Sequence, residues 1–195
     1  TTVGLHFLSK THRYHNQPLW SKLAGASVQV RKKSLWLEAE AATDHTNKKL
    51  DFGWFSSFQY FRNRFRFNNN LAYAGKQFYG YYNNSWLVNS SAYVNFSPKI
   101  TLGAMVNYNR INPSLDSTMY SQSPYSVSNI AEFILRPTDK ARISISYNHL
   151  HREDRAPQKR FNFKEDYLRY MYFLTERRFT WSLDGSYGYS QNLIA

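Results

Sequence analysis

A two-residue alternation recurs along almost the whole chain, and it is the feature that most limits what the chain can fold into. In "ITLGAMVNYN" the apolar or aromatic residues from Ile100 to Tyr108 fall at every second position, with small or polar residues between them. Successive side chains of a β-strand point to opposite faces, so this pattern is typical of a strand with one apolar face. Helical spacing is weak throughout. The pattern therefore predicts an all-β protein with about eleven strands, at residues 2–9, 22–31, 34–43, 50–61, 64–74, 85–96, 100–110, 126–136, 141–150, 166–174 and 179–190.

The connections between these segments alternate between short and long. The short ones are 31–33, 62–63, 97–99, 137–140 and 175–177, and the long ones run through 9–22, 42–49, 74–84, 107–126 and 151–166. A soluble sandwich has no reason to sort its connections in this way. Tight turns at one end and longer loops at the other instead indicate an up-and-down antiparallel transmembrane β-barrel.

Aromatic residues make up 18% of the chain, and in the predicted strands they gather at the ends of the apolar face. In a membrane barrel those ends lie at the two lipid–water interfaces, where aromatic girdles form. The alternation therefore predicts that the lipid bilayer is a partner of the chain and that the cell outer membrane is its location. The candidates for lipid-facing or girdle residues are Trp54, Phe65, Phe67, Trp86, Phe96, Tyr108, Phe133, Tyr147, Phe179, Trp181 and Tyr187.

The opposite face carries charges of both signs. One interpretation is a hydrated interior whose charges neutralise one another, and the other is a channel with tuned selectivity. The candidates for lumen-facing charges are Glu38, Glu40, Arg64, Arg66, Glu132, Arg136, Arg142, Arg169 and Asp184.

Net charge and hydropathy narrow the alternatives. The formal charge is +12, the mean hydropathy is −0.63, and no apolar run approaches the ~20 residues of a transmembrane helix. Basic residues gather at the tight turns, where anionic headgroups would attract them. Nucleic acid would use interleaved charges and aromatics such as "FRNRFRFNNN". There, however, Phe65 and Phe67 share one face and the arginines the other, so no nucleic-acid partner is expected.

No motif for catalysis or for a cofactor is visible. The chain has no cysteine, and its six histidines have no carboxylate or cysteine at a spacing that completes a metal site (His6, His12, His15, His45, His149, His151). No serine and acid accompany a histidine in a recognisable hydrolase arrangement. We expect no metal, no cofactor and no enzyme activity. The aromatic loops at 79–82 and 119–125 are expected to pack over the mouth of the barrel, and the alternative is that they contact sugars or a partner protein.

We expect residues 1–195 to form a single domain. An odd count of eleven strands does not fit a complete bacterial barrel, which has an even number. The chain also begins at Thr1 without a signal peptide. We therefore expect either a fragment of a larger barrel or a strand that this assignment has missed or split.

Two hairpin sequences carry a resemblance to a known group of proteins. "NFSPKITLGAMVNYNR" and "LRPTDKARISISYNHLHRED" resemble strand–turn–strand hairpins of large outer-membrane barrels from Bacteroidetes-type, Gram-negative bacteria. The second hairpin, with "YLRYMYFLTERRFTW", is also similar to barrels that follow a sugar-binding β-sandwich domain. The resemblance implies a porin-like β-barrel membrane protein and offers no catalytic motif. No such sandwich lies within these residues, so no sugar-binding role is carried over.

The function expected from these patterns is passage, docking or scaffolding at the outer membrane, with other outer-membrane or periplasmic proteins as possible partners. The alternative is a soluble all-β binding protein for glycan or another anionic ligand. That alternative requires the apolar face to be buried against a second layer.

Overall fold

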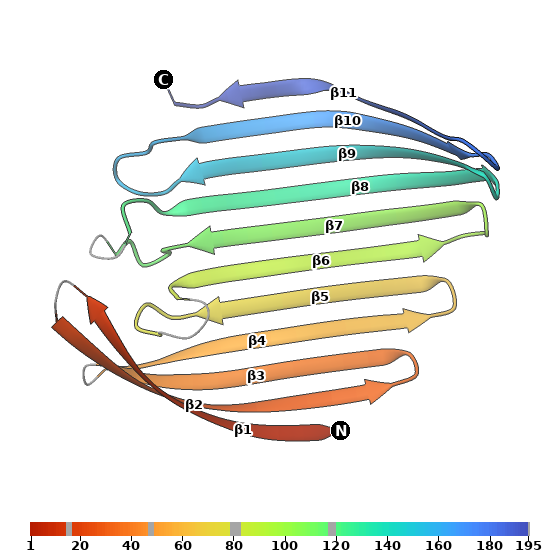
Figure 1. The fold of residues 1–195 in the computed structure, drawn as a ribbon. Coiled ribbons are helices and arrows are strands. Elements are labelled where there is room, and N and C mark those ends of the chain that lie inside the picture. Colours follow the sequence, from red (N-terminus) through yellow and green to blue (C-terminus); the bar gives the residue numbers. More distant parts are fainter. Residues whose placement is uncertain (15–16, 47–48, 79–82, 117–119, 195) are drawn as a thin grey trace.

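The computed structural model describes residues 1–14, 17–46, 49–78, 83–116 and 120–194, without the side chains of residues 10–19. Its strands form one antiparallel sheet in which each strand pairs with its neighbours in sequence (Figure 1). In the described residues no helix is long and apolar enough to cross a membrane. The strands are β1 (Thr2–Tyr14), β2 (Gln17–Lys32), β3 (Leu35–Thr46), β4 (Lys49–Arg62), β5 (Phe65–Ala74), β6 (Ser85–Asn95), β7 (Ile100–Ile111), β8 (Pro124–Thr138), β9 (Ala141–Asp154), β10 (Asn162–Thr175) and β11 (Thr180–Asn192).

The all-β, up-and-down arrangement of eleven strands is confirmed. Each expected segment overlaps one observed strand, because alternation is a local consequence of strand geometry. The five tight turns also lie along one edge of the sheet, on the right in Figure 1.

Two of the five expected long loops were wrong. Within 9–22, β1 continues to Tyr14 and β2 begins at Gln17, and these two residues pair with each other. Within 42–49, β3 continues to Thr46, which pairs with Lys49 of β4. The sequence of these hairpin arms has no clear two-residue alternation, yet the backbone ladder continues through them. Long connections remain at 75–84, 112–123 and 155–161.

Register defines two faces of the sheet. Paired residues of neighbouring strands lie on the same face, so a row such as Leu37–Phe58–Asn69 can be followed across the sheet. We call the face that contains Leu37 and Phe58 the apolar face, and the one that contains Glu38 and Ser57 the polar face.

Burial on these two faces is inverted relative to a soluble protein. In the strands whose side chains are described, the buried residues other than glycine all lie on the polar face: Ser21, Ala42, Asp44, Thr46, Ser57, Ala72, Ala74, Ser85, Thr101, Ile134, Ser144, Asn148 and Asp154. Most of the large apolar side chains that are exposed lie on the apolar face, including Trp54, Trp86 and Trp181. The sheet is curved (Figure 1), and side chains on the inner side of a curved sheet converge and cover one another. Within the described chain only neighbouring strands contact one another, so no second layer covers the apolar face.

The sheet is open rather than closed into a barrel, since β1 and β11 are not paired with each other in the described residues. Both strands run from the tight-turn edge toward the loop edge (Figure 1). The two edge strands, β1 and β11, also expose apolar-face side chains most fully. Phe7 of β1 is 82% exposed and Tyr187 of β11 is 83% exposed.

Candidate functional site

A hollow of about 540 Å³ lies on the polar face, next to the tight turns of β5 to β9. We call it the basic pocket. One row of paired residues crosses it from Arg66 through Tyr93 and Gly103 to Glu132. A second row, nearer the turns, runs from Asn95 through Thr101 to Ile134. The lining is completed by Arg64, Ser97, Pro98, Arg136 and Arg142.

Four arginines and one glutamate line this pocket, which leaves a net charge of +3. In the described part of the chain only one of the four forms an ion pair: the Nη2 of Arg142 lies 3.6 Å from Oε1 of Glu132. The same carboxylate oxygen accepts a hydrogen bond from the Ser144 hydroxyl at 2.6 Å. Glu132 therefore neutralises one guanidinium group and leaves the excess positive charge to the others.

The other three arginines are held by uncharged groups. Arg64 donates to the carbonyl oxygen of Phe96 at 3.1 Å, and Arg136 donates to the Thr101 hydroxyl at 3.2 Å. The guanidinium carbon of Arg66 lies 5.1 Å from the centre of the Phe61 ring, in a cation–π arrangement. These contacts position the three groups without neutralising them.

The local backbone helps to position two pocket residues, Arg136 and Tyr93, on the polar face. Pro137 has no N–H to donate to the ladder, and the register between β8 and β9 shifts between Leu135 and Thr138. Arg136, just before the proline, has its backbone N–H on the carbonyl oxygen of Lys99 in the neighbouring turn. A glycine at 103 accommodates the ring of its partner Tyr93, since an added Cβ there would lie 2.4 Å from Cε1 of that ring.

The structure places the remaining predicted lumen charges on the polar face but away from the basic pocket. Glu38 pairs with Ser57, and Glu40 pairs with Phe55. Far along the sheet, Nε of Arg169 donates to Oδ1 of Asp184 at 3.0 Å, and both side chains are about half exposed. Sequence reasoning therefore grouped residues that the fold separates into a pocket and two outlying sites.

The residues predicted to face lipid lie on the apolar face wherever the register places them: Trp54, Phe65, Phe67, Trp86, Tyr108, Phe133, Tyr147, Trp181 and Tyr187. Several are in ring contact across strands, such as Trp86 and Tyr108, whose centroids are 5.5 Å apart. Phe96 and Phe179 lie just outside the strands, in tight turns, and both are exposed.

A few polar side chains interrupt the apolar face. Asn69 and Ser90 are neighbours in the middle of it, and the Ser90 hydroxyl donates to Oδ1 of Asn69 at 2.5 Å. Nearer the loop edge, Oδ1 of Asp166 accepts from the Tyr147 hydroxyl and lies 2.7 Å from Nδ1 of His149. These groups satisfy one another, which limits the cost of placing them among apolar neighbours.

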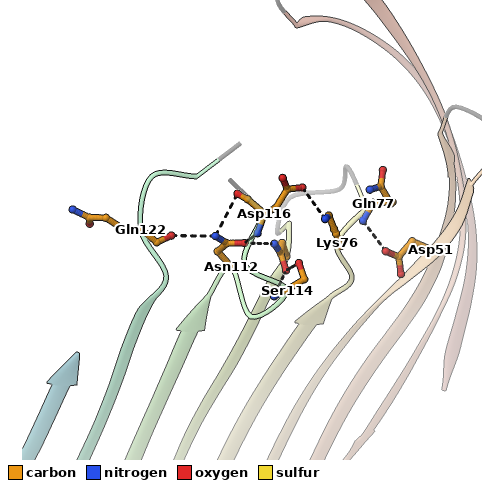
Figure 2. Close-up of polar contacts among 8 residues, drawn as sticks. Asp51, Lys76, Gln77, Asn112, Ser114, Asp116 and Gln122 are labelled. Atoms are coloured by element: carbon orange, nitrogen blue, oxygen red, sulfur yellow. Dashed lines mark hydrogen bonds and ion pairs between the residues drawn. The ribbon is translucent and has the colours of Figure 1, made fainter. Parts of the chain in front are cut away.

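At the opposite edge, two long loops are locked together through paired asparagines. Asn84 and Asn112 have positive φ angles of 41° and 55°, a conformation that asparagine tolerates better than most residues. The Asn84 side-chain amide donates to Oδ1 of Asn112 at 2.7 Å, and the Asn112 backbone N–H donates to the Asn84 carbonyl oxygen at 2.7 Å. Figure 2 shows that Asn112 is also hydrogen-bonded to Asp116 and Gln122. The Nζ of Lys76 lies 3.5 Å from Oδ2 of Asp116 and forms an ion pair with it. The described parts of these two loops, residues 75–78 with 83–84 and residues 112–116 with 120–123, are therefore connected, and we call them the loop platform.

The first of these loops also bends onto the polar face. The Gln77 backbone N–H donates to Oδ2 of Asp51 at 2.7 Å (Figure 2). The Phe78 ring is only 7% exposed and packs with Ala42 and Ala74. An added Cβ at Gly53 would lie 2.6 Å from that ring. Phe78 thus lies on a floor of small polar-face side chains that β3, β4 and β5 present.

Asp154 connects this platform to the next loop. Its Oδ1 accepts from the backbone N–H groups of Ser123 at 2.8 Å and Ala156 at 3.0 Å. Burial raises the pKa of the Asp154 carboxyl, but these backbone donors and the nearby Arg160 outweigh burial and hold the pKa below its ordinary value. The carboxylate form is therefore the one that holds these loops.

Among the described residues no group of three or more His, Cys, Asp or Glu side chains could hold a metal ion. Nε2 of His6 lies 2.9 Å from the Ser27 hydroxyl, and Nε2 of His151 lies 3.0 Å from Oδ1 of Asn162. His15, the aromatic segment 79–82 and Met119 lie outside the described residues.

Sequence reasoning missed several residues of both sites. Tyr93, Asn95 and Thr101 line the basic pocket, and Phe78 and the paired asparagines organise the loops. Asparagine before a strand and after one is a weak indication of a positive φ, but the contacts themselves depend on register across several strands.

Comparison with family profiles, with curated proteins and with solved structures found no match to the chain.

Proposed function

We propose that this sheet forms part of the wall of an integral β-barrel of the outer membrane. Its apolar face would meet lipid, and its polar face would meet a water-filled lumen. Its work would be passage, docking or scaffolding. The observation that carries the proposal is the inverted burial: small polar side chains are buried on one face, while large aromatic and aliphatic side chains are exposed on the other. In water such an apolar surface would be a liability, whereas in lipid it is the favourable arrangement.

The height of the apolar face supports this proposal. On β6 and its turn, the apolar face extends from Trp86 to Phe96. At a rise of ~3.3 Å per residue this is about 33 Å along the strand, or about 25 Å across the bilayer at a tilt of ~40°. That height matches the apolar band of about 25 Å found in outer-membrane barrels.

The open edges set a condition on closure. In a membrane every backbone polar group needs a partner, so β1 and β11 each need a further neighbour. Because both run in the same direction, closing them on each other requires a parallel pair. Antiparallel closure requires an odd number of additional strands, from this chain or from another.

The test uses the five tryptophans of the chain. Trp54 and Trp86 lie on the apolar face, while Trp36 pairs with Gln59 on the polar face. In variants that retain one tryptophan each, with phenylalanine at the other four positions, the protein is folded into bilayers of lipids brominated on their acyl chains. We expect bromine to quench the fluorescence of Trp54 and Trp86 strongly and that of Trp36 weakly.

A second readout is migration on a gel with and without heating after extraction in detergent. A folded barrel should migrate differently from the heat-denatured chain. Equal quenching of Trp36 and Trp54, or a folded monomer that stays soluble without detergent, would reject the membrane proposal. The latter result would favour the alternative of a soluble all-β protein that binds an anionic ligand on its polar face.

A further inference from the structure

We infer that the basic pocket is a binding site for a small multivalent oxyanion, a phosphate- or carboxylate-bearing solute dissolved in the water on the polar face. This inference deepens the proposed function and rests on it in one respect, namely that the polar face meets water.

Charge is the first support. The pocket gathers four guanidinium groups around one carboxylate within a single hollow, for a net charge of +3. Like charges that line the same hollow repel one another, so a protein that only needed a hydrated surface would gain by separating or pairing them. The pair of Arg169 and Asp184 on the same face is an example of that arrangement. A bound anion removes the repulsion in the pocket.

Geometry is the second support. A guanidinium group presents its N–H donors as a planar fork that matches carboxylate and phosphate oxygens. Arg64 and Arg136 are each fixed by a hydrogen bond to an uncharged oxygen, which holds the side chain but leaves its charge uncompensated. In addition, Nε of Arg142 is buried and has no hydrogen-bond partner among the described residues. That nitrogen is too enclosed to meet a ligand in the hollow, so the contacts with an oxyanion fall to the guanidinium groups that line it.

The residues that line the pocket limit the size and the chemical class of the ligand. Tyr93, Asn95 and Thr101 add neutral polar and aromatic contacts between the arginines. A volume of about 540 Å³ is within the usual range for small-molecule pockets and exceeds the space that a single inorganic ion needs. The pocket also lies on the face opposite the apolar residues, which favours a soluble anion over a lipid headgroup.

The experiment measures binding of inorganic pyrophosphate by titration calorimetry to the protein folded in an uncharged detergent. We expect saturable binding that weakens as salt is added. The double variant R64Q/R136Q should bind at least tenfold more weakly. The matched control is R169Q, which removes an arginine from the same face but outside the pocket, and its affinity should stay within about twofold of the parent protein. Gel migration with and without heating verifies that each variant is folded.

The outcomes separate this inference from the proposed function. A folded protein that does not bind pyrophosphate, or an equal loss of affinity in R169Q and R64Q/R136Q, would overturn the anion site while leaving the quenching result intact. Binding of a short-chain phosphatidic acid without any response to pyrophosphate would also overturn it, because the ligand would then be a lipid. Conversely, pyrophosphate binding that depends on Arg64 and Arg136 would stand even if Trp54 and Trp36 were equally quenched.

Discussion

Replacing Phe78 with alanine should release residues 75–78 from the polar face while leaving the sheet intact. The ring is almost fully buried, and the surface beneath it consists of small residues of β3, β4 and β5, namely Ala42, Gly53 and Ala74. Burial of a phenylalanine side chain contributes about 1.5–3 kcal/mol, and a cavity that cannot collapse adds to the loss. We therefore expect the free energy of local loop opening to fall by about 2–3 kcal/mol, which is about a 30- to 150-fold rise in the open population.

Amide hydrogen exchange measures this change at individual residues. The Asn84 N–H donates to the Gly75 carbonyl oxygen at 3.0 Å, and the Asn112 N–H donates to the Asn84 carbonyl oxygen at 2.7 Å. Exchange at both positions should accelerate in F78A. Amides in the middle of β7, such as that of Val106, serve as the internal control and should keep their protection.

A double-mutant cycle makes the prediction strict. G53A places a methyl group 2.6 Å from the Phe78 ring, so it should expel the ring and accelerate exchange by itself. In the F78A background the same methyl group meets no ring, and the second substitution should add little. Unchanged exchange at Asn84 in F78A, or additive effects of G53A and F78A, would refute the proposed packing of Phe78.

Three further predictions concern the loop platform and the basic pocket. Because the folded-state pKa of Asp154 lies below its ordinary value of 3.8, the stability that this carboxylate provides should be present above about pH 4 and be lost as the pH falls through the folded-state pKa. Hydrogen exchange of the Ser123 amide, corrected for its intrinsic rate, should show this loss of protection in the parent protein and not in D154N. N112A should lower the local stability of both loops by about 2–3 kcal/mol, because it removes the side-chain amide that bonds to Asn84 and leaves a strained positive φ. N112G should lose less stability because glycine relieves the strain. Equal losses of stability, measured by limited proteolysis, would remove strain from the explanation. E132Q raises the pocket charge from +3 to +4 and should tighten pyrophosphate binding at least about fourfold at low salt, since each pair of unit charges at ~5 Å in a water-like medium is worth ~0.8 kcal/mol and pyrophosphate carries several charges. Weaker binding would indicate that the carboxylate positions Arg142 rather than opposing the anion.

The strands were predictable because their pattern is local. Each residue between Ile100 and Tyr108 belongs to one face or the other by position alone, and the observed strand β7 includes all of them. The arms at the ends of β1 to β4 were missed for the same reason, since the sequence there has no clear period of two. Only the continuing ladder of backbone hydrogen bonds reveals these arms as strands.

Alternation along each strand is enough to assign the two faces and the face on which each arginine lies. The gathering of Arg64, Arg66, Arg136 and Arg142 in one pocket is a property of the folded sheet instead, because it depends on the register of five strands and on the shift at Pro137. The position of Phe78 depends in the same way on small residues that three different strands bring into one row. Face assignment follows from a spacing of two along one strand, whereas a site requires the relative displacement of several strands, which no single segment encodes.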